Sequence, residues 1–174
     1  MLQRARNFAF IDGNNLHMAV RDLGWRIDHK RFRVFLRERY QVEKAYYFVG
    51  FVEYNAGLYQ HLQEAGFILI FKPTIKKPDG EVKGNVDAEL VLYAAAKVID
   101  DYDGAIIVTG DGDFHCLVEY LKEKDKLLHV MVPNDKFSKL LGRFTKDIVR
   151  VNRLRTQLEY SGNKKTRSSG RSKP

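Results

Sequence analysis

Residues 105–114 read Ala-Ile-Ile-Val-Thr-Gly-Asp-Gly-Asp-Phe, and this stretch decides the fold class. The apolar residues at its start, mostly β-branched, predict a buried strand. Gly-Asp-Gly-Asp predicts a tight turn, and a periodic apolar pattern over residues 114–121 predicts that a helix follows. In an open α/β sheet, ligands bind at the carboxyl ends of the strands. We therefore expect Asp111 and Asp113 at the functional edge of a sheet.

The same alternation of strands and helices runs through the chain. Strands are predicted at residues 7–11, 44–49, 67–71, 105–108, 127–132 and 148–151, and helices at residues 14–23, 29–40, 56–65, 85–100, 113–123 and 136–141. Asn14 or Asn15 is expected to cap the first helix. A short β-ribbon is expected around the turn Pro78-Asp79-Gly80.

This pattern predicts the α/β class, as a three-layer α/β/α sandwich with a mainly parallel, Rossmann-like central sheet. The strand order 3-2-1-4-5 would place the strand that ends at Asp12 beside the strand that ends before Asp111. The chain reverses its direction across the sheet between these two strands. Such a switch point is where a binding crevice opens.

Length and composition are those of a soluble globular protein: 174 residues, 44% hydrophobic and 30% charged. We expect one domain over residues 1–152 and a basic extension over residues 153–174, disordered from about residue 161. No apolar run is long enough for a bilayer, and residues 1–6 lack a signal-peptide core. Cys116 is the single cysteine, which excludes an internal disulfide and favours the cytoplasm.

The net charge of +8 is concentrated at the C-terminus. Residues 153–174 hold seven basic residues and one acid, which accounts for +6 of the total. The remaining body is nearly neutral, so the charge supports a polyanionic partner only through the extension.

Two further aspartates are expected close to the turn at residues 109–113. Asp12 follows the first predicted strand, and Asp87 lies in the first turn of a predicted helix whose residues at i+3, i+4, i+7 and i+11 are all apolar. The face with Asp87 should therefore pack on the sheet, whereas Glu89 should face solvent. For any one of these aspartates alone, helix capping is the favoured explanation, since Asp12 and Asp111 could satisfy free backbone N–H groups.

Four converging carboxylates favour a metal site over capping. Their mutual repulsion raises each pKa, and a hard divalent cation removes that cost. Mg²⁺ and Mn²⁺ prefer oxygen ligands, and in nucleases such cations activate water and hold the scissile phosphate. We therefore expect Asp12, Asp87, Asp111 and Asp113 to bind Mg²⁺ or Mn²⁺, as the acidic residues of a nuclease do.

Three motifs in this order give a specific resemblance: Phe-Ile-Asp-Gly-Asn-Asn at 10–15, Lys-Gly-Asn-Val-Asp at 83–87 and Val-Thr-Gly-Asp-Gly-Asp-Phe at 108–114. Together they resemble the NYN domain family, which has a PIN-like ribonuclease fold, and its LabA-like branch in particular. The resemblance spans about residues 7–151. It implies a metal-dependent ribonuclease with the four aspartates at its site. It also implies that Asn15 supports Asp12 and contacts substrate, and that Thr109 orders the acidic turn.

Basic and aromatic side chains are weaker candidates for RNA contacts. Lys83 and Lys72 are expected near the carboxyl edge, where a lysine can hold a phosphate, although either could be a solvated surface residue. Arg21 and Arg26 are lesser candidates.

Phe51, Tyr54 and Trp25 could stack bases of single-stranded RNA, but packing is the favoured interpretation. His115 is expected to face solvent, with a general-acid role as the lesser alternative. The aspartates at 100, 101 and 103 precede a strand and are interpreted as a solvated turn at the opposite edge.

Two other functions remain open at this stage. The chain could be an RNA-binding or regulatory module that hardly cuts, on the same fold. It could also be a phosphatase that forms an aspartyl phosphoenzyme, but that chemistry expects an acid two positions after Asp12, where Asn14 stands. The sequence also leaves a homodimer and a DNA substrate open.

Overall fold

The computed structural model describes residues 5–72, 75–76, 82–83 and 86–162. Its core is a six-stranded sheet in which every neighbouring pair of strands is parallel. The strands, in spatial order, are β3 (Ile68–Lys72), β2 (Val42–Gly50), β1 (Asn7–Asp12), β6 (Gly104–Val108), β7 (Leu127–Val132) and β8 (Ile148–Arg150). The predicted class, layers and order of the first five strands are confirmed.

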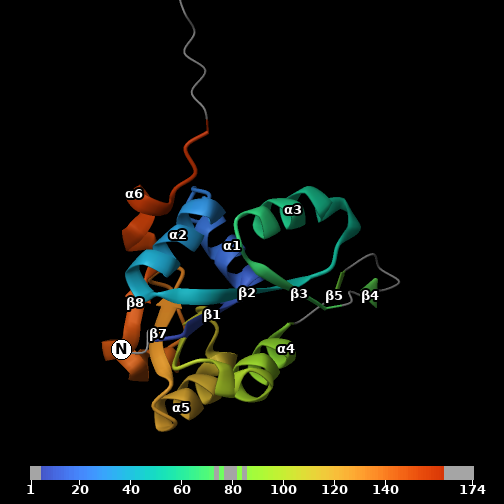
Figure 1. Ribbon diagram of the computed structural model, residues 1–174. Coiled ribbons are helices and arrows are strands. Elements are labelled where there is room, and N and C mark those ends of the chain that lie inside the picture. The colour runs from blue at the N-terminus through green and yellow to red at the C-terminus, as the bar shows by residue number, and fades with distance from the viewer. Residues whose placement is uncertain (1–4, 73–74, 77–81, 84–85, 163–174) are drawn as a thin grey trace, which may run out of the picture.

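Helices cover both faces of the sheet (Figure 1). One face carries α1 (Gly13–Arg21), α2 (His29–Tyr40), α3 (Ala56–Glu64) and α6 (Arg155–Leu158), and the other carries α4 (Asp87–Leu92) and α5 (His115–Glu123). Strand β1 is buried on both sides. Its Ala9 and Ile11 join the core beneath α1 and α2, whereas Phe8 and Phe10 join the core above α4 and α5. Strand β1 therefore lies in the interior of the sheet, between β2 and β6, and contributes to both cores.

The carboxyl ends of β1 and β6 meet at the switch point. Ile11 pairs with Val108, so Asp12 and Thr109 leave the sheet side by side. Asp12, and neither Asn14 nor Asn15, is the N-cap of α1, because its carboxylate accepts a hydrogen bond from the backbone N–H of Asn15. The expectation of an asparagine cap was therefore wrong.

The helix predicted at residues 85–100 is interrupted. After α4 the chain continues as a π-helical segment, Tyr93–Lys97, and a 3-10 turn, Ile99–Asp101. The buried hydroxyl of Tyr102 donates to the carbonyl oxygen of Ala94 and so provides this carbonyl with a partner from outside the helix. A single regular helix was the wrong prediction here, because a residue outside the segment satisfies its backbone.

The helix predicted at residues 136–141 is also wrong. Residues 136–140 form an irregular turn, and a 3-10 segment follows at Leu141–Asp147. The backbone N–H of Ser138 donates to the carbonyl oxygen of Gly110 (3.0 Å), which ties the segment to the acidic turn. That long-range contact replaces the local helical hydrogen bonds.

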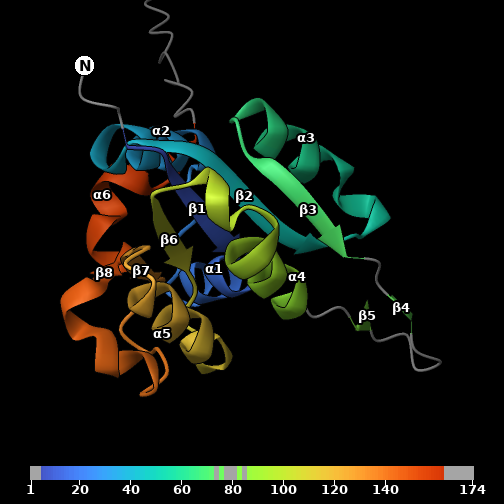
Figure 2. The same cartoon turned by 60° about the horizontal axis from the view of Figure 1, so that its bottom comes forward.

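The predicted ribbon is present as β4 (Ile75–Lys76) paired antiparallel with β5 (Val82–Lys83). Figure 2 shows this ribbon beyond the end of β3, apart from the main sheet. The expected disordered extension falls mainly on residues 163–174, which lie outside the described residues. Among the described helices, none combines the length and the apolar character needed to cross a bilayer.

Candidate metal centre

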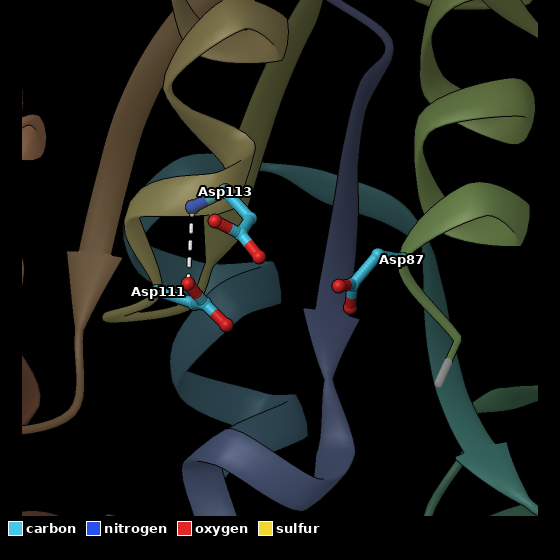
Figure 3. A group of neighbouring side chains, drawn as sticks. All are labelled: Asp87, Asp111 and Asp113. Carbon is cyan, nitrogen blue, oxygen red and sulfur yellow. Dashed lines mark hydrogen bonds between the residues drawn. The ribbon is translucent and has the colours of Figure 1, made fainter. Parts of the chain in front are cut away.

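Three aspartates meet at the carboxyl edge of the sheet. One carboxylate oxygen from each of Asp87, Asp111 and Asp113 lies within 4.8 Å of the others. Figure 3 shows Asp87 pointing across the end of β1 towards the other two. Two segments that are far apart in the sequence therefore supply one compact group of oxygen ligands.

Asp111 and Asp113 come from the turn that follows β6. Asp111 caps the 3-10 segment Gly112–Phe114, because its Oδ1 accepts a hydrogen bond from the N–H of Asp113 (3.0 Å; dashed in Figure 3). A side chain at Gly112 would collide with Ser138, so the turn can pack there only as glycine. Capping orients Asp111 and leaves its second oxygen for another partner.

Asp87 is the first residue of α4, and the apolar residues around it fix its place. Val86 and Leu90 are buried against the sheet, which holds the first turn of the helix beside β1. Asp87 itself is half-buried at the rim of this packing. The helical periodicity thus delivers its carboxylate to the edge where β6 ends.

Asp12 lies beneath these three residues and is only 5% exposed. Its Oδ1 accepts from the N–H of Asn15 (3.2 Å), and its Oδ2 accepts from the hydroxyl of Thr109 (3.1 Å). Burial raises the pKa of Asp12 to about 6, and the charges of Asp87 and Asp111 add to this, against the two hydrogen bonds. Asp12 is therefore in electrostatic contact with the cluster but outside the set of three closely spaced oxygens.

Thr109 and Asn15 connect Asp12 to the acidic turn. The fully buried hydroxyl of Thr109 donates to Asp12 and accepts from the N–H of Asp111 (3.2 Å). The side-chain oxygen of Asn15 accepts from the N–H of Gly110 (2.8 Å). Both residues fix the position of α1 relative to the acidic turn. The family resemblance did not predict these particular hydrogen bonds.

The basic candidates have different positions. Lys72 ends β3 and forms an ion pair with Glu89 (3.6 Å), in which both side chains are about two-thirds buried. Glu89 was expected to face solvent, and that prediction was wrong because the end of β3 covers it. The side chain of Lys83 lies outside the described part of the chain.

The aromatic candidates and His115 divide by exposure. Trp25 is buried in the core, so the packing interpretation holds for it, whereas Phe51 and Tyr54 are exposed, Tyr54 by 85%. Phe51 also packs against Tyr59 and Phe71. His115 is half-buried with Nδ1 3.0 Å from the carbonyl oxygen of Gly112, which corrects the expectation of a solvent-facing ring.

The donor set fits a hard divalent cation. Mg²⁺ takes oxygens at about 2.0–2.1 Å, so ligands on opposite sides of the ion lie about 4.2 Å apart. The oxygens of the cluster lie within 4.8 Å of one another, which is close to that value. Carboxylates are also the ligand type that Mg²⁺ and Mn²⁺ favour.

The fold and the site together make this protein an α/β/α sandwich with a cluster of acidic residues at the switch point of its parallel sheet. The sequence profile of the NYN domain family matches residues 8–152, and the chain belongs to that family. It is 27% identical over 161 residues to the low amplitude and bright protein LabA of Synechococcus elongatus, an alignment that covers 86% of each chain. The crystal structure of a protein of unknown function from Vibrio parahaemolyticus has the same fold, with a TM-score of 0.76, 23% identity, and coverage of 92% of this chain and 99% of that one.

Proposed function

We propose that this protein is a metal-dependent endoribonuclease. The observation that carries the proposal is the meeting of Asp87, Asp111 and Asp113 at the switch point of a parallel sheet, with oxygens within 4.8 Å. Like charges at this spacing repel each other, and a divalent cation bound by the carboxylates offsets this repulsion. Membership in the NYN family supports the assignment to RNA chemistry.

The three clustered aspartates would hold one or two Mg²⁺ or Mn²⁺ ions directly, and Asp12 would act from below. Bound there, the cation supplies Lewis-acid activation of water and charge neutralisation at the scissile phosphate. Asp12 is positioned by Thr109 and Asn15, and above pH 6 it adds a negative charge beneath the cluster. Thr109 keeps Asp12 and Asp111 in register, since one hydroxyl bonds to both residues.

RNA would approach along the carboxyl edge of the sheet. Asn15 lies at this edge beside the acidic turn, and Lys72 ends β3. Lys83, in β5, would be a further phosphate contact. Lys72 would exchange its ion pair with Glu89 for a phosphate oxygen. Single-stranded RNA is the substrate we propose, because an exposed aromatic side chain such as that of Tyr54 can stack on an unpaired base.

Cleavage of a labelled single-stranded RNA in the presence of Mn²⁺ tests the proposal. The wild type should cut internally and stop when EDTA is added, and Asp111→Asn should lose cleavage while it still binds the RNA. Asp100→Asn, an exposed substitution of the same type at the other edge of the sheet, is the matched control and should cut normally. If the wild type binds RNA but is as inert as Asp111→Asn, the protein is a binding or regulatory module instead.

A further inference from the structure

A cleft lies among the helices on the sheet face that carries α1, α2 and α3. Figure 1 shows this face opposite the one that carries α4 and α5. Its volume is about 440 Å³, within the range of small-molecule sites. None of its lining residues belongs to the acidic cluster or to the hydrogen bonds around Asp12. The family assignment and the proposed cleavage leave this cleft unexplained.

The inner wall of the cleft is apolar and aromatic. Trp25, Val20 and Ile27 line it and are themselves buried, so the core fixes the position of this wall. Leu58, at the start of α3, lines the cleft and remains 38% exposed, which places it at the mouth. A wall of this kind suits a flat ring system.

The polar lining of the cleft is basic or imidazole in character. Arg21 and Arg26 line it and contribute two guanidinium groups, and no carboxylate is among the lining residues. Arg21 pairs with Asp22 at 3.6 Å, but both side chains are more than 60% exposed, so that pair is weak and readily exchanged. Arg26 lies over the ring of Tyr160 at 5.1 Å, which holds it at the cleft. Arginine is the residue best suited to bind phosphate oxygens in pairs.

Three histidines complete the lining: His17, His29 and His61. The rings of His29 and His61 pack edge to face at 5.9 Å. Burial, and next the neighbouring His61, lower the pKa of His29 to about 4, while Asp28 opposes the shift. A neutral imidazole offers one donor and one acceptor, as the polar edge of a nucleobase requires.

We propose that this cleft binds a nucleoside phosphate, with the base beside the exposed side chain of Leu58, above the apolar floor to which Trp25 and Ile27 contribute, and with the phosphate on Arg21 and Arg26. Two kinds of ligand carry this group: a free mononucleotide and the 5′-phosphorylated terminal nucleotide of an RNA strand. Binding of either kind is independent of the acidic cluster and would persist in a protein that does not cleave RNA.

Trp25 makes the test direct, because it is the only tryptophan of the chain and lies in the cleft. The full chain in EDTA is titrated with AMP and GMP while tryptophan fluorescence is recorded, with adenosine and inorganic phosphate as partial ligands. A saturable change is expected with the nucleotides, and at least about tenfold weaker binding with either part alone, since each part lacks half of the contacts. A 5′-phosphorylated oligoribonucleotide distinguishes the two kinds of ligand: affinity equal to that of AMP identifies an RNA end, and much weaker binding identifies a free nucleotide.

Two variants locate the site. Arg26→Ala should weaken AMP binding about tenfold or more, and Leu58→Glu, which places a carboxylate at the mouth, should abolish it. Arg143→Ala removes an exposed guanidinium elsewhere on the surface and is the matched control. Asp111→Asn should bind AMP like the wild type, so failure of the cleavage proposal and failure of this one are distinguishable. No saturable change with any nucleotide up to about 10 mM, or unaltered binding in both Arg26→Ala and Leu58→Glu, would overturn the proposal.

Discussion

The difference in the free energy of unfolding between Asp12→Asn and the wild type, both without metal, should increase in favour of the variant as the pH rises from acidic to neutral. Asp12 is buried, and its pKa is raised from the ordinary 3.8 to about 6, mainly by loss of solvent. The folded protein therefore binds a proton at this site more tightly than the unfolded chain does. The amide side chain in Asp12→Asn carries no charge in either state, so its contribution would not vary with pH.

The magnitude follows from linkage between the two protonation equilibria. Because the folded pKa is the higher one, the favourable contribution is complete below about pH 3.8 and is lost as the pH rises through about 6. A shift of about two pKa units corresponds to a loss of about 3 kcal/mol. About 2 kcal/mol of that loss falls between about pH 4.5 and pH 7.5.

Urea unfolding in EDTA at these two pH values measures the difference. The free energy of unfolding of Asp12→Asn minus that of the wild type should increase by about 2 kcal/mol from the lower to the higher pH. Any constant cost of the substitution, such as altered hydrogen bonds to Asn15 and Thr109, cancels in this comparison. Asp100→Asn, on the exposed turn before β6, is the control and should show a flat difference.

A pH-independent difference for Asp12→Asn would refute the reasoning, because it would mean that the ionised carboxylate is as stable in the fold as in water. A difference that decreases with pH would contradict it more strongly, since it requires a depressed pKa. Added Mn²⁺ should reduce the pH dependence of the wild type, because a nearby cation stabilises the ionised form of Asp12.

Three other perturbations have defined outcomes. Mn²⁺ at about 100 times its Kd should stabilise the wild type by about 2.7 kcal/mol in urea unfolding at pH 7.5, and Asp111→Asn should lose most of this gain; equal gains would exclude Asp111 as a ligand. Thr109→Val deprives buried Asp12 of a donor and should cost about 1–3 kcal/mol, whereas Thr109→Ser keeps the hydroxyl; identical thermal melts of the two variants would contradict this role. Gly112→Ala should be destabilised by collision with Ser138, and adding Ser138→Gly should recover part of the loss, so strictly additive effects in the double variant would argue against the collision.

Features that depend on short stretches of chain were predictable from the sequence. The strand and turn at residues 105–113 contain their own signals, because an apolar run, a glycine and a capping aspartate are adjacent. The position of Asp87 followed from the apolar face of one helix, since Leu90 and Ala94 pack on the sheet as their spacing requires. Parallel strand order then brought Asp87 and Asp111 together.

Features that depend on contacts between distant segments were not predictable. The bond from Tyr102 to Ala94 that accompanies the π-helical segment carries no local signal in the run of alanines. The contact between Ser138 and Gly110 likewise replaced a helix whose periodicity looked adequate. Glu89 was misplaced because its exposure depends on where β3 ends.

The position of Asp12 below the three clustered aspartates also emerged only from the structure. The place of Asp12 at the end of the first predicted strand indicated that it lies near the turn. It did not indicate that one of its oxygens accepts a hydrogen bond from Asn15 and the other accepts one from Thr109. A sequence motif identifies which residues gather at a site. The hydrogen bonds show which of their oxygens are already engaged, as both oxygens of Asp12 are.

The most direct test of the central claim is the anomalous scattering of Mn²⁺ in crystals of the protein soaked with this ion. The account predicts a peak at the carboxyl edge of the sheet, with oxygens of Asp87, Asp111 and Asp113 at about 2.0–2.2 Å from it. Lack of a peak at saturating Mn²⁺, or a peak coordinated without Asp87, would contradict the claim that these two distant segments share one cation.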